Sequence, residues 1–171
     1  MLDPIARGVT LLELLFALAI LAIVAAIGIP GLREFIITQR LKAAAETVYG
    51  DLSLARDEAL HRNRTISVAF EFDAAGTRWC YAPSDHLPCD CQRHECGIGT
   101  PGHHEASETD FRDISLRTNF YRRAVSFHPV RGTANPGTIT LSARDRIVEV
   151  KVSNLGRIRL CAAGLGAYPE C

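Results

Sequence analysis

The sequence predicts an α+β fold in which one long N-terminal helix packs on antiparallel β-sheet. Apolar residues first form an almost unbroken run and then recur with helical spacing as far as about residue 61. Beyond that point, several short segments alternate apolar and polar residues and are separated by turn-forming residues. The chain has 171 residues, 47% of them hydrophobic, which is enough for one globular domain and an apolar anchor.

The first predicted element is an apolar helix long enough to cross a membrane. From Val9 to Ile29 the chain has twenty-one residues, of which only Thr10 and Glu13 are polar. At 1.5 Å per residue this run spans roughly 31 Å, close to the hydrocarbon thickness of a bilayer. An ordinary cleaved signal peptide fits less well, because the run is too long and a carboxylate lies inside it.

Glu13 is the unusual residue of this segment, because a charge in a membrane helix is costly unless it has a partner. No Lys or Arg occurs between Arg7 and Arg33, so the partner must come from another chain or from a newly formed amino terminus. The surrounding stretch R-G-V-T-L-L-E-L-L, residues 7–15, resembles the processing site of type IV prepilins and type II secretion pseudopilins.

That resemblance implies how the N-terminus is processed. In this family a prepilin peptidase cuts after the glycine and methylates the new amine, and a glutamate holds the fifth position of the mature chain. Residues 1–8 would then be a leader peptide, cut between Gly8 and Val9, with N-methylation of Val9 and an assembly role for Glu13. Pro30 falls at position 22 of the mature chain, where pilins often carry a helix-kinking proline, whereas Val9 replaces the more usual Phe.

Charge pairing would give Glu13 its role in a filament. In a bundle of helices, the Glu13 carboxylate of one subunit could pair with the Val9 ammonium of its neighbour, offsetting the desolvation of both charges. Head-to-tail contacts of this kind build open helical assemblies. The resemblance therefore implies a single-pass inner-membrane protein with a cytoplasmic N-terminus, which later joins major and minor pilins in a pilus or pseudopilus.

Beyond Pro30 the predicted helix becomes amphipathic. One stripe of apolar side chains recurs at steps of four and three residues: Ile37, Leu41, Ala45, Val48, Leu52, Ala55 and Ala59. The pattern predicts a single helix from residue 9 to about 61, bent near Pro30 and Gly31. Residues 9–30 would be its transmembrane and assembly part, and residues 31–171 would form the globular domain.

The rest of the chain is predicted to be antiparallel β structure. Residues 65–72 alternate, and residues 74–81 return through an Ala-Gly turn as a hairpin. Further strands are predicted at 114–117, 124–128, 137–142 and 146–153, whereas 83–110 is predicted to be a long loop. The order of F-H-P-V-R-G, G-T-I-T-L and N-L-G-R-I-R-L between residues 127 and 160 resembles the GspH/FimT branch of pseudopilins and minor pilins. The resemblance implies a pilin-like fold.

The six cysteines all follow the apolar segment. The resemblance places them in the periplasm or outside the cell, where an even number favours disulfides. Nearness in sequence suggests Cys161 with Cys171, and two bridges whose pairing stays open among Cys80, Cys89, Cys91 and Cys96. The alternative is a zinc site with His86 or His94, but the C-x2-C spacing of such sites is missing. No metal, cofactor or catalytic arrangement is expected.

The formal charge is zero but is distributed unevenly. Residues 71–110 carry two Arg against eight Asp and Glu, and residues 112–171 carry ten Arg and Lys against four Asp and Glu. The basic part could therefore bind a polyanion, or it could pair with the acidic part within the fold.

A short motif in the basic part points to DNA. In G-R-I-R-L-C, residues 156–161, extended backbone would place Arg157 and Arg159 on one face about 6.6 Å apart. Two guanidiniums side by side suit adjacent phosphates, and such contacts bind DNA without reading its sequence. Gly156, Arg157 and Arg159 also match a G-R-x-R motif that is implicated in DNA capture in FimT-like minor pilins of transformable bacteria.

Other residues could add to this surface. Three cations on the preceding hairpin are expected to extend it: Arg144, Arg146 and Lys151. Tyr121 lies beside two arginines and could stack on a base, or it could be a strand aromatic of the core.

Two functions remain open from the sequence. The first is a minor pilin of a type IV pilus that binds DNA for uptake during natural transformation. The second is a structural pseudopilin of a type II secretion system or pilus-initiation complex, whose basic surface contacts another subunit. Both share the processing motif, so only the G-R-x-R motif favours the first.

Overall fold

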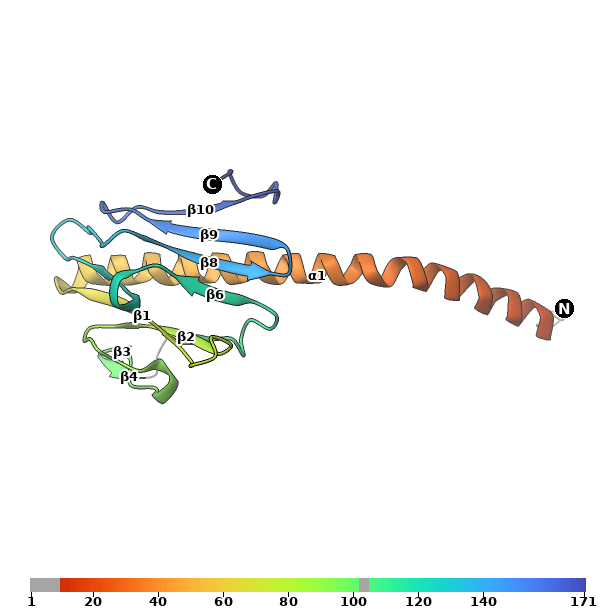
Figure 1. Cartoon of the computed structure of the whole chain (residues 1–171), viewed down its shortest axis with the longest axis horizontal. Coiled ribbons are helices and arrows are strands. Elements are labelled where there is room, and N and C mark those ends of the chain that lie inside the picture. The colour runs from red at the N-terminus through yellow and green to blue at the C-terminus, as the bar shows by residue number, and fades with distance from the viewer. Residues whose placement is uncertain (1–9, 102–104) are drawn as a thin grey trace, which may run out of the picture. The chain divides into compact units, whose positions relative to one another are not determined.

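The structure, a computed structural model, describes residues 10–101 and 105–171. The chain divides into two compact units, residues 1–36 and 37–171, and helix α1, Leu11–Arg62, has residues in both (Figure 1). The proposed cleavage and methylation positions, Gly8 and Val9, lie outside the described residues.

The first unit contains the apolar part of α1. Almost all described side chains between residues 11 and 36 are exposed, including large aliphatic ones such as Leu11 and Ile27. The helix is long and apolar enough to cross a membrane, as the sequence predicted. α1 continues through Pro30 without interruption, and the predicted bend at this residue stays a prediction.

The second unit contains the amphipathic half of α1, and its apolar stripe lies in the core as predicted. Ile37 packs against the core, and the other predicted positions are buried together with Ala44. α1 ends at Arg62, one residue from the predicted end. Because four of these eight residues are alanines, the sheets can approach the helix closely.

The first sheet is antiparallel, with strand order β5-β2-β1-β7. Its central strand β1, Ile66–Phe72, pairs with β2, Trp79–Ser84, and with β7, Ala124–Phe127. The predicted hairpin is thus confirmed, although its second strand begins later and extends to Ser84. The short strand β5, Ala106–Ser107, continues the sheet beside β2.

The second sheet is also antiparallel, with order β10-β9-β8-β6. It consists of β6, Ser115–Thr118; β8, Gly137–Ala143; β9, Arg146–Val152; and β10, Ile158–Ala162. The strands predicted at 114–117, 137–142 and 146–153 agree with β6, β8 and β9 within one residue at each end, whereas no strand bounds were predicted for β10. The last strand, β10, lies at one edge of the sheet and pairs only with β9 in the described part of the chain (Figure 1).

Both sheets contribute to one hydrophobic core with the second half of α1. Trp79 and Tyr81 stack in this core, and the Trp79 Nε1–H donates to the Ile114 carbonyl oxygen at 3.0 Å. The Tyr81 hydroxyl donates to Asp51 Oδ2 of α1 at 2.7 Å. Burial, together with the Asp51 charge, raises the pKa of Tyr81 well above its usual range, so this link is protonated and intact at neutral pH.

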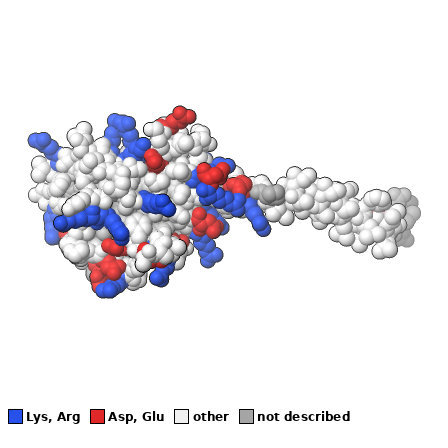
Figure 2. Space-filling model, viewed as in Figure 1, with Lys and Arg blue, Asp and Glu red and all other residues white. Residues whose placement is uncertain are grey.

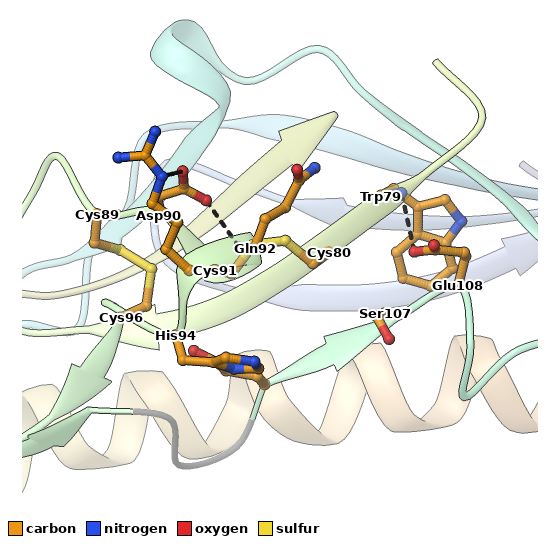
Figure 3. The surroundings of a disulfide bond; sticks show 12 residues. Trp79, Cys80, Cys89, Asp90, Cys91, Gln92, His94, Cys96, Ser107 and Glu108 are labelled. Atoms are coloured by element: carbon orange, nitrogen blue, oxygen red, sulfur yellow. Dashed lines mark hydrogen bonds and ion pairs between the residues drawn. A yellow bond between two sulfur atoms is a disulfide. The ribbon is translucent and has the colours of Figure 1, made fainter. Parts of the chain in front are cut away.

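The segment 83–110 is more structured than the predicted loop. It contains the 3₁₀ turn η1, Cys91–Arg93, and a small hairpin of β3, Gly97–Ile98, and β4, Thr100–Pro101, in addition to β5. Two-residue strands are too short for an alternating pattern, which explains why periodicity did not reveal them. Asp90 caps the start of η1, because its side chain accepts a hydrogen bond from the Gln92 backbone N–H (Figure 3). The same carboxylate forms an ion pair with Arg93.

Disulfides hold this segment to the first sheet. Cys80 of β2 bonds with Cys91, and Cys89 bonds with Cys96, within a buried cluster that includes Ala69 and Ala82 (Figure 3). Since these four sulfurs form two disulfides, they cannot serve as thiolate ligands of zinc, and the zinc alternative is wrong. The third bridge joins Cys161 of β10 to Cys171, as predicted.

Candidate nucleic-acid interface

The two arginines of the G-R-x-R motif lie at the open edge of the second sheet. Arg157 precedes β10 and Arg159 belongs to it, and both side chains are exposed. Between and beyond them, Ile158 and Leu160 are half-buried and pack against the core. This alternation is the one predicted from extended geometry, so both arginines are exposed at the edge of the sheet while Ile158 and Leu160 are half-buried.

A tight turn between β9 and β10 places the motif. The Gly156 N–H donates to the Ser153 carbonyl oxygen at 2.9 Å, and the Ser153 N–H donates to the Arg157 carbonyl oxygen at 3.0 Å. The Ser153 hydroxyl oxygen also accepts from the Arg157 N–H at 3.1 Å. Gly156 has a φ of +69°, in the left-handed region that favours glycine.

Gly156 also lies against a second loop. A Cβ atom at this position would come within 1.8 Å of the Gly132 carbonyl oxygen, which no side chain can tolerate without movement of the backbone. The two loops are joined by the Ala134 N–H, which donates to the Asn154 carbonyl oxygen at 3.2 Å. The glycine of the motif is therefore required for the loop contact that fixes the start of β10.

Substituting Gly156 by Ala should destabilise the second unit by about 3 kcal/mol, through steric collision and a strained positive φ. The measurement is chemical unfolding of the variant and of the unaltered chain. Gly164 is a matched control, because it has the same φ of +69° but an added Cβ would meet nothing within 4 Å. Gly164→Ala should cost only about 1 kcal/mol, the conformational penalty alone. Equal losses for both variants would show that the loop contact is unimportant.

A groove separates α1 from the arginines of β10. It has a volume of about 400 Å³ and is lined on one wall by Tyr49, Ser53, Arg56 and Asp57 of α1, and on the other by residues 157–159. The residues of the first wall lie next to the core stripe of the helix, so their backbone is firmly held. Arginine residues thus line both walls of the groove.

The acidic segment does not neutralise these arginines. Its carboxylates pair elsewhere, for example Asp73 with Arg78 and Asp85 with Arg64. Within the described ranges, neither Arg157 nor Arg159 makes an ion pair. Acidic and basic side chains are mixed over the visible face of the second unit, so a large field of one sign is absent from that face (Figure 2). The local groove, not the net charge, is the feature that suits an anion.

The structure brings only one of the three supporting cations close to the motif. Lys151 is the direct cross-strand partner of Arg159, on the same face, although its Nζ also pairs with Glu149 at 3.1 Å. Arg146 begins β9, five residues from Lys151, which is about 17 Å along the strand. Arg144 lies in the adjoining turn. The register of the hairpin therefore separates Arg144 and Arg146 from the motif.

Tyr121 is exposed, so its assignment to the core is wrong. It lies in the 3₁₀ turn η2, Tyr121–Arg123, with 78% of its surface exposed. The Arg122 guanidinium lies over its ring, 5.4 Å from the centroid. This pair is separate from the groove, whose lining does not include it.

The start of α1 gives Glu13 a second possible role. The Thr10 hydroxyl oxygen accepts a hydrogen bond from the Glu13 N–H at 3.2 Å, as expected of an N-cap residue. Glu13 is exposed and lies in the first turn, where the helix dipole favours a carboxylate. The spacing T-x-x-E is a capping-box signature that was visible in the sequence and was not used there.

Arg56 is the groove residue that sequence reasoning did not identify. It lies outside the apolar stripe of α1, on the part of the helix where a charged residue is usually solvated. It lies a hundred residues from the motif, and no local pattern could have indicated that the two meet across a groove.

Two family models match this chain. The model of a family described as "Type II transport protein GspH" matches residues 44–156, which include most of the second unit. A second model, described as "Prokaryotic N-terminal methylation motif", matches residues 5–29. No protein among the curated ones matches the chain.

Solved structures share the fold at low sequence identity. The type IV minor pilin FimU of Pseudomonas aeruginosa (strain PAO1) aligns with a TM-score of 0.53 and 22% identity, covering 76% of this chain and 97% of that chain. A second crystal form of FimU gives a TM-score of 0.50 and 20% identity over 72% and 97% of the two chains. The minor pseudopilin EpsH from the type 2 secretion system of Vibrio cholerae has a TM-score of 0.49 and 16% identity, with 73% and 98% covered.

Proposed function

The chain belongs to the GspH family of minor pilins and pseudopilins, and from this premise we propose that it is a DNA-binding minor pilin of a type IV pilus. Arg157 and Arg159 contact the phosphate backbone of double-stranded DNA without reading its sequence. Gly156 fixes the turn that presents them, and Lys151 lies beside them. The filament carries this surface outside the inner membrane and takes part in DNA uptake during natural transformation.

One observation carries the proposal. Arg157 and Arg159 are exposed at the start of the edge strand β10, line a groove with a further arginine and have no ion-pair partner in the described part of the chain. Exposed guanidiniums without carboxylate partners are available for phosphates, which they bind in bidentate geometry. The DNA-binding part of the proposed function therefore depends on these two arginines, and the part played in a pilus depends on the family.

The N-terminal steps of the proposal follow from the methylation motif at residues 5–29. A prepilin peptidase cuts between Gly8 and Val9 and methylates the Val9 amine. Before assembly the apolar half of α1 anchors the chain in the inner membrane, with the N-terminus in the cytoplasm and residues 31–171 in the periplasm. Glu13 then pairs with the amino terminus of a neighbouring subunit as the chain enters the filament.

The description of the matched family favours a second candidate. A type II transport protein would act as a structural pseudopilin, and its basic groove would contact another subunit. To bind this groove, a neighbouring subunit must carry carboxylates in positions that match the arginines. DNA of any sequence offers a regular row of phosphates instead. Binding to unrelated DNA duplexes therefore separates the two candidates.

The test uses the fragment from Gly31 onward, which retains every residue of the core and all three disulfides. At about 50 mM salt it should shift two duplexes of equal length and unrelated sequence with similar affinity, because phosphate contacts carry no sequence information. Binding should fall steeply between 50 and about 200 mM salt. If neither duplex were shifted at low salt, the DNA role would be abandoned in favour of the structural pseudopilin.

A further inference from the structure

We propose that Arg56 of α1 is a third cation of the DNA site, and that the groove between α1 and β10 holds phosphates of one DNA strand. This inference rests on the proposed function and extends it to a residue outside the G-R-x-R motif. Its basis is the placement of Arg56 across the groove from Arg157 and Arg159.

The Nε atom of Arg56 lacks a hydrogen-bond partner although it is buried. A buried donor without an acceptor is unfavourable, because it has lost its hydrogen bonds to water, and such groups are rare in folded proteins. Arg56 makes no ion pair in the described part of the chain either. Nε is covered by the loops at Gly132 and Gly156, whereas the half-buried side chain as a whole lines the groove, so an anion that enters the groove would meet the other atoms of this guanidinium.

Two glycines leave room for this guanidinium. A Cβ atom at Gly132 would lie 2.9 Å from Arg56 Nε, and a Cβ atom at Gly156 would lie 3.3 Å from the same atom. Both glycines have positive φ, so both loops approach Arg56 with their backbone alone. The glycine of the motif thus touches both the turn that presents Arg157 and the arginine on the opposite wall.

The charge of the groove lining suits a phosphate. Its lining includes three arginines and one aspartate, Asp57. The Ser53 hydroxyl on the helix wall donates to the Tyr49 carbonyl oxygen at 2.8 Å, so this hydroxyl does not compete for the guanidiniums. The lining thus has an excess of positive charge, and binding of a polyanion relieves the repulsion between its cations.

Cations on two walls match the chemistry of a phosphodiester. Each phosphate has two anionic oxygens, so one phosphate can accept from Arg56 on the helix wall and from Arg157 or Arg159 on the strand wall. A carboxylate also has two acceptor oxygens, but an isolated acidic side chain offers one such group, whereas a DNA strand offers a row of phosphates that can engage several cations at once. The groove therefore fits the backbone of a DNA strand better than an isolated acidic side chain of a neighbouring subunit.

The test compares Arg56→Gln with Arg62→Gln in the full chain, held in a non-ionic detergent, on one DNA duplex. Arg62 is a matched control because it lies on the same helix but pairs with Glu58 and lies near Gly99, away from the groove. Arg56→Gln should weaken binding roughly tenfold and lower the slope of log affinity against log salt by about 0.9, the value for one lost phosphate contact. Arg62→Gln should leave both unchanged.

Thermal unfolding gives an independent readout. Arg56→Met should keep or raise Tm, because it removes an unsatisfied buried donor and a repelled charge. If Arg56 served only in packing, its replacement by Met would lower Tm and leave DNA affinity unchanged. That pair of results would overturn the inference.

The outcomes also separate this inference from the proposed function. If the unaltered chain bound no DNA, the proposed function itself would fail. If the chain bound DNA and lost binding on removal of Arg157 and Arg159, but Arg56→Gln bound normally with the same salt slope, only the role of Arg56 would be wrong. Loss of filament incorporation by Arg56→Gln with normal DNA binding would assign Arg56 to a neighbouring subunit and would also overturn the inference.

Discussion

Replacing Arg157 and Arg159 together by Ala should weaken binding to double-stranded DNA by about 100-fold at low salt. Each guanidinium is expected to make one charge-assisted phosphate contact, and two such contacts contribute about 3 kcal/mol. Both side chains are exposed and lack ion-pair partners in the described ranges, so their removal should not disturb the core. Titration of a labelled duplex with each protein measures the effect.

The control for this experiment must change the net charge equally. Arg78 and Arg93 are suitable, because they pair with Asp73 and Asp90 in the acidic segment, far from the groove in sequence and absent from its lining. Arg78→Ala with Arg93→Ala also removes two positive charges. A loss of DNA affinity as large as that of the motif variant would mean that net charge, rather than the groove, determines binding.

Glu13→Gln should abolish entry of the chain into filaments while leaving its membrane insertion intact. If Glu13 pairs with the amino terminus of a neighbouring subunit, the charge is required and glutamine cannot replace it. If Glu13 only supports the first turn of α1 beside Thr10, glutamine should serve almost as well, because it is also accepted in a capping box. The variant thus distinguishes assembly from capping.

The measurement is the amount of the chain in sheared filaments relative to the membrane fraction. Glu13→Val removes the carboxylate but keeps the backbone N–H that donates to the Thr10 hydroxyl, and it should also be absent from filaments. Thr10→Ala removes only the capping hydroxyl and should be incorporated nearly normally. Normal incorporation of Glu13→Gln would contradict the charge-pairing account and leave capping as the role of Glu13.

The fold could be predicted from the sequence wherever a periodic pattern extended over several turns or strands. The stripe from Ile37 to Ala59 was recognisable because each of its residues is buried on one side of one helix. In β9, Val148, Val150 and Val152 alternate with half-buried or exposed residues for the same reason. Elements of two residues, such as β5, have no period and depend on the sheet they join.

Contacts between distant segments could not be predicted in this way. The sequence suggested that four cysteines form two bridges, but their pairing depends on how the segment 83–110 folds back over β2. Likewise, Arg56 meets the G-R-x-R motif only because α1 and β10 border the same groove. A single sequence contains the residue types of such a site but not their distances.

The supporting cations of the β9–β10 hairpin also show that nearness in the sequence does not predict nearness in the fold. Arg144, Arg146 and Lys151 were grouped by their nearness in the sequence. In an antiparallel pair, however, the distance from the connecting turn decides which residues are neighbours, so Lys151 lies opposite Arg159 while Arg146 lies at the other end of β9. We expect that Lys151→Ala would weaken DNA binding less than either arginine of the motif, since Glu149 already pairs with it.

The most direct test of the DNA-binding account is a salt series on the unaltered fragment from Gly31 onward and its Arg157→Ala/Arg159→Ala variant. The account predicts that log affinity for duplex DNA falls linearly with log salt, and that the variant has a slope smaller by about 1.8, the value for two lost phosphate contacts. An unaltered fragment that does not bind at low salt, or a variant with the same affinity and slope, would contradict it.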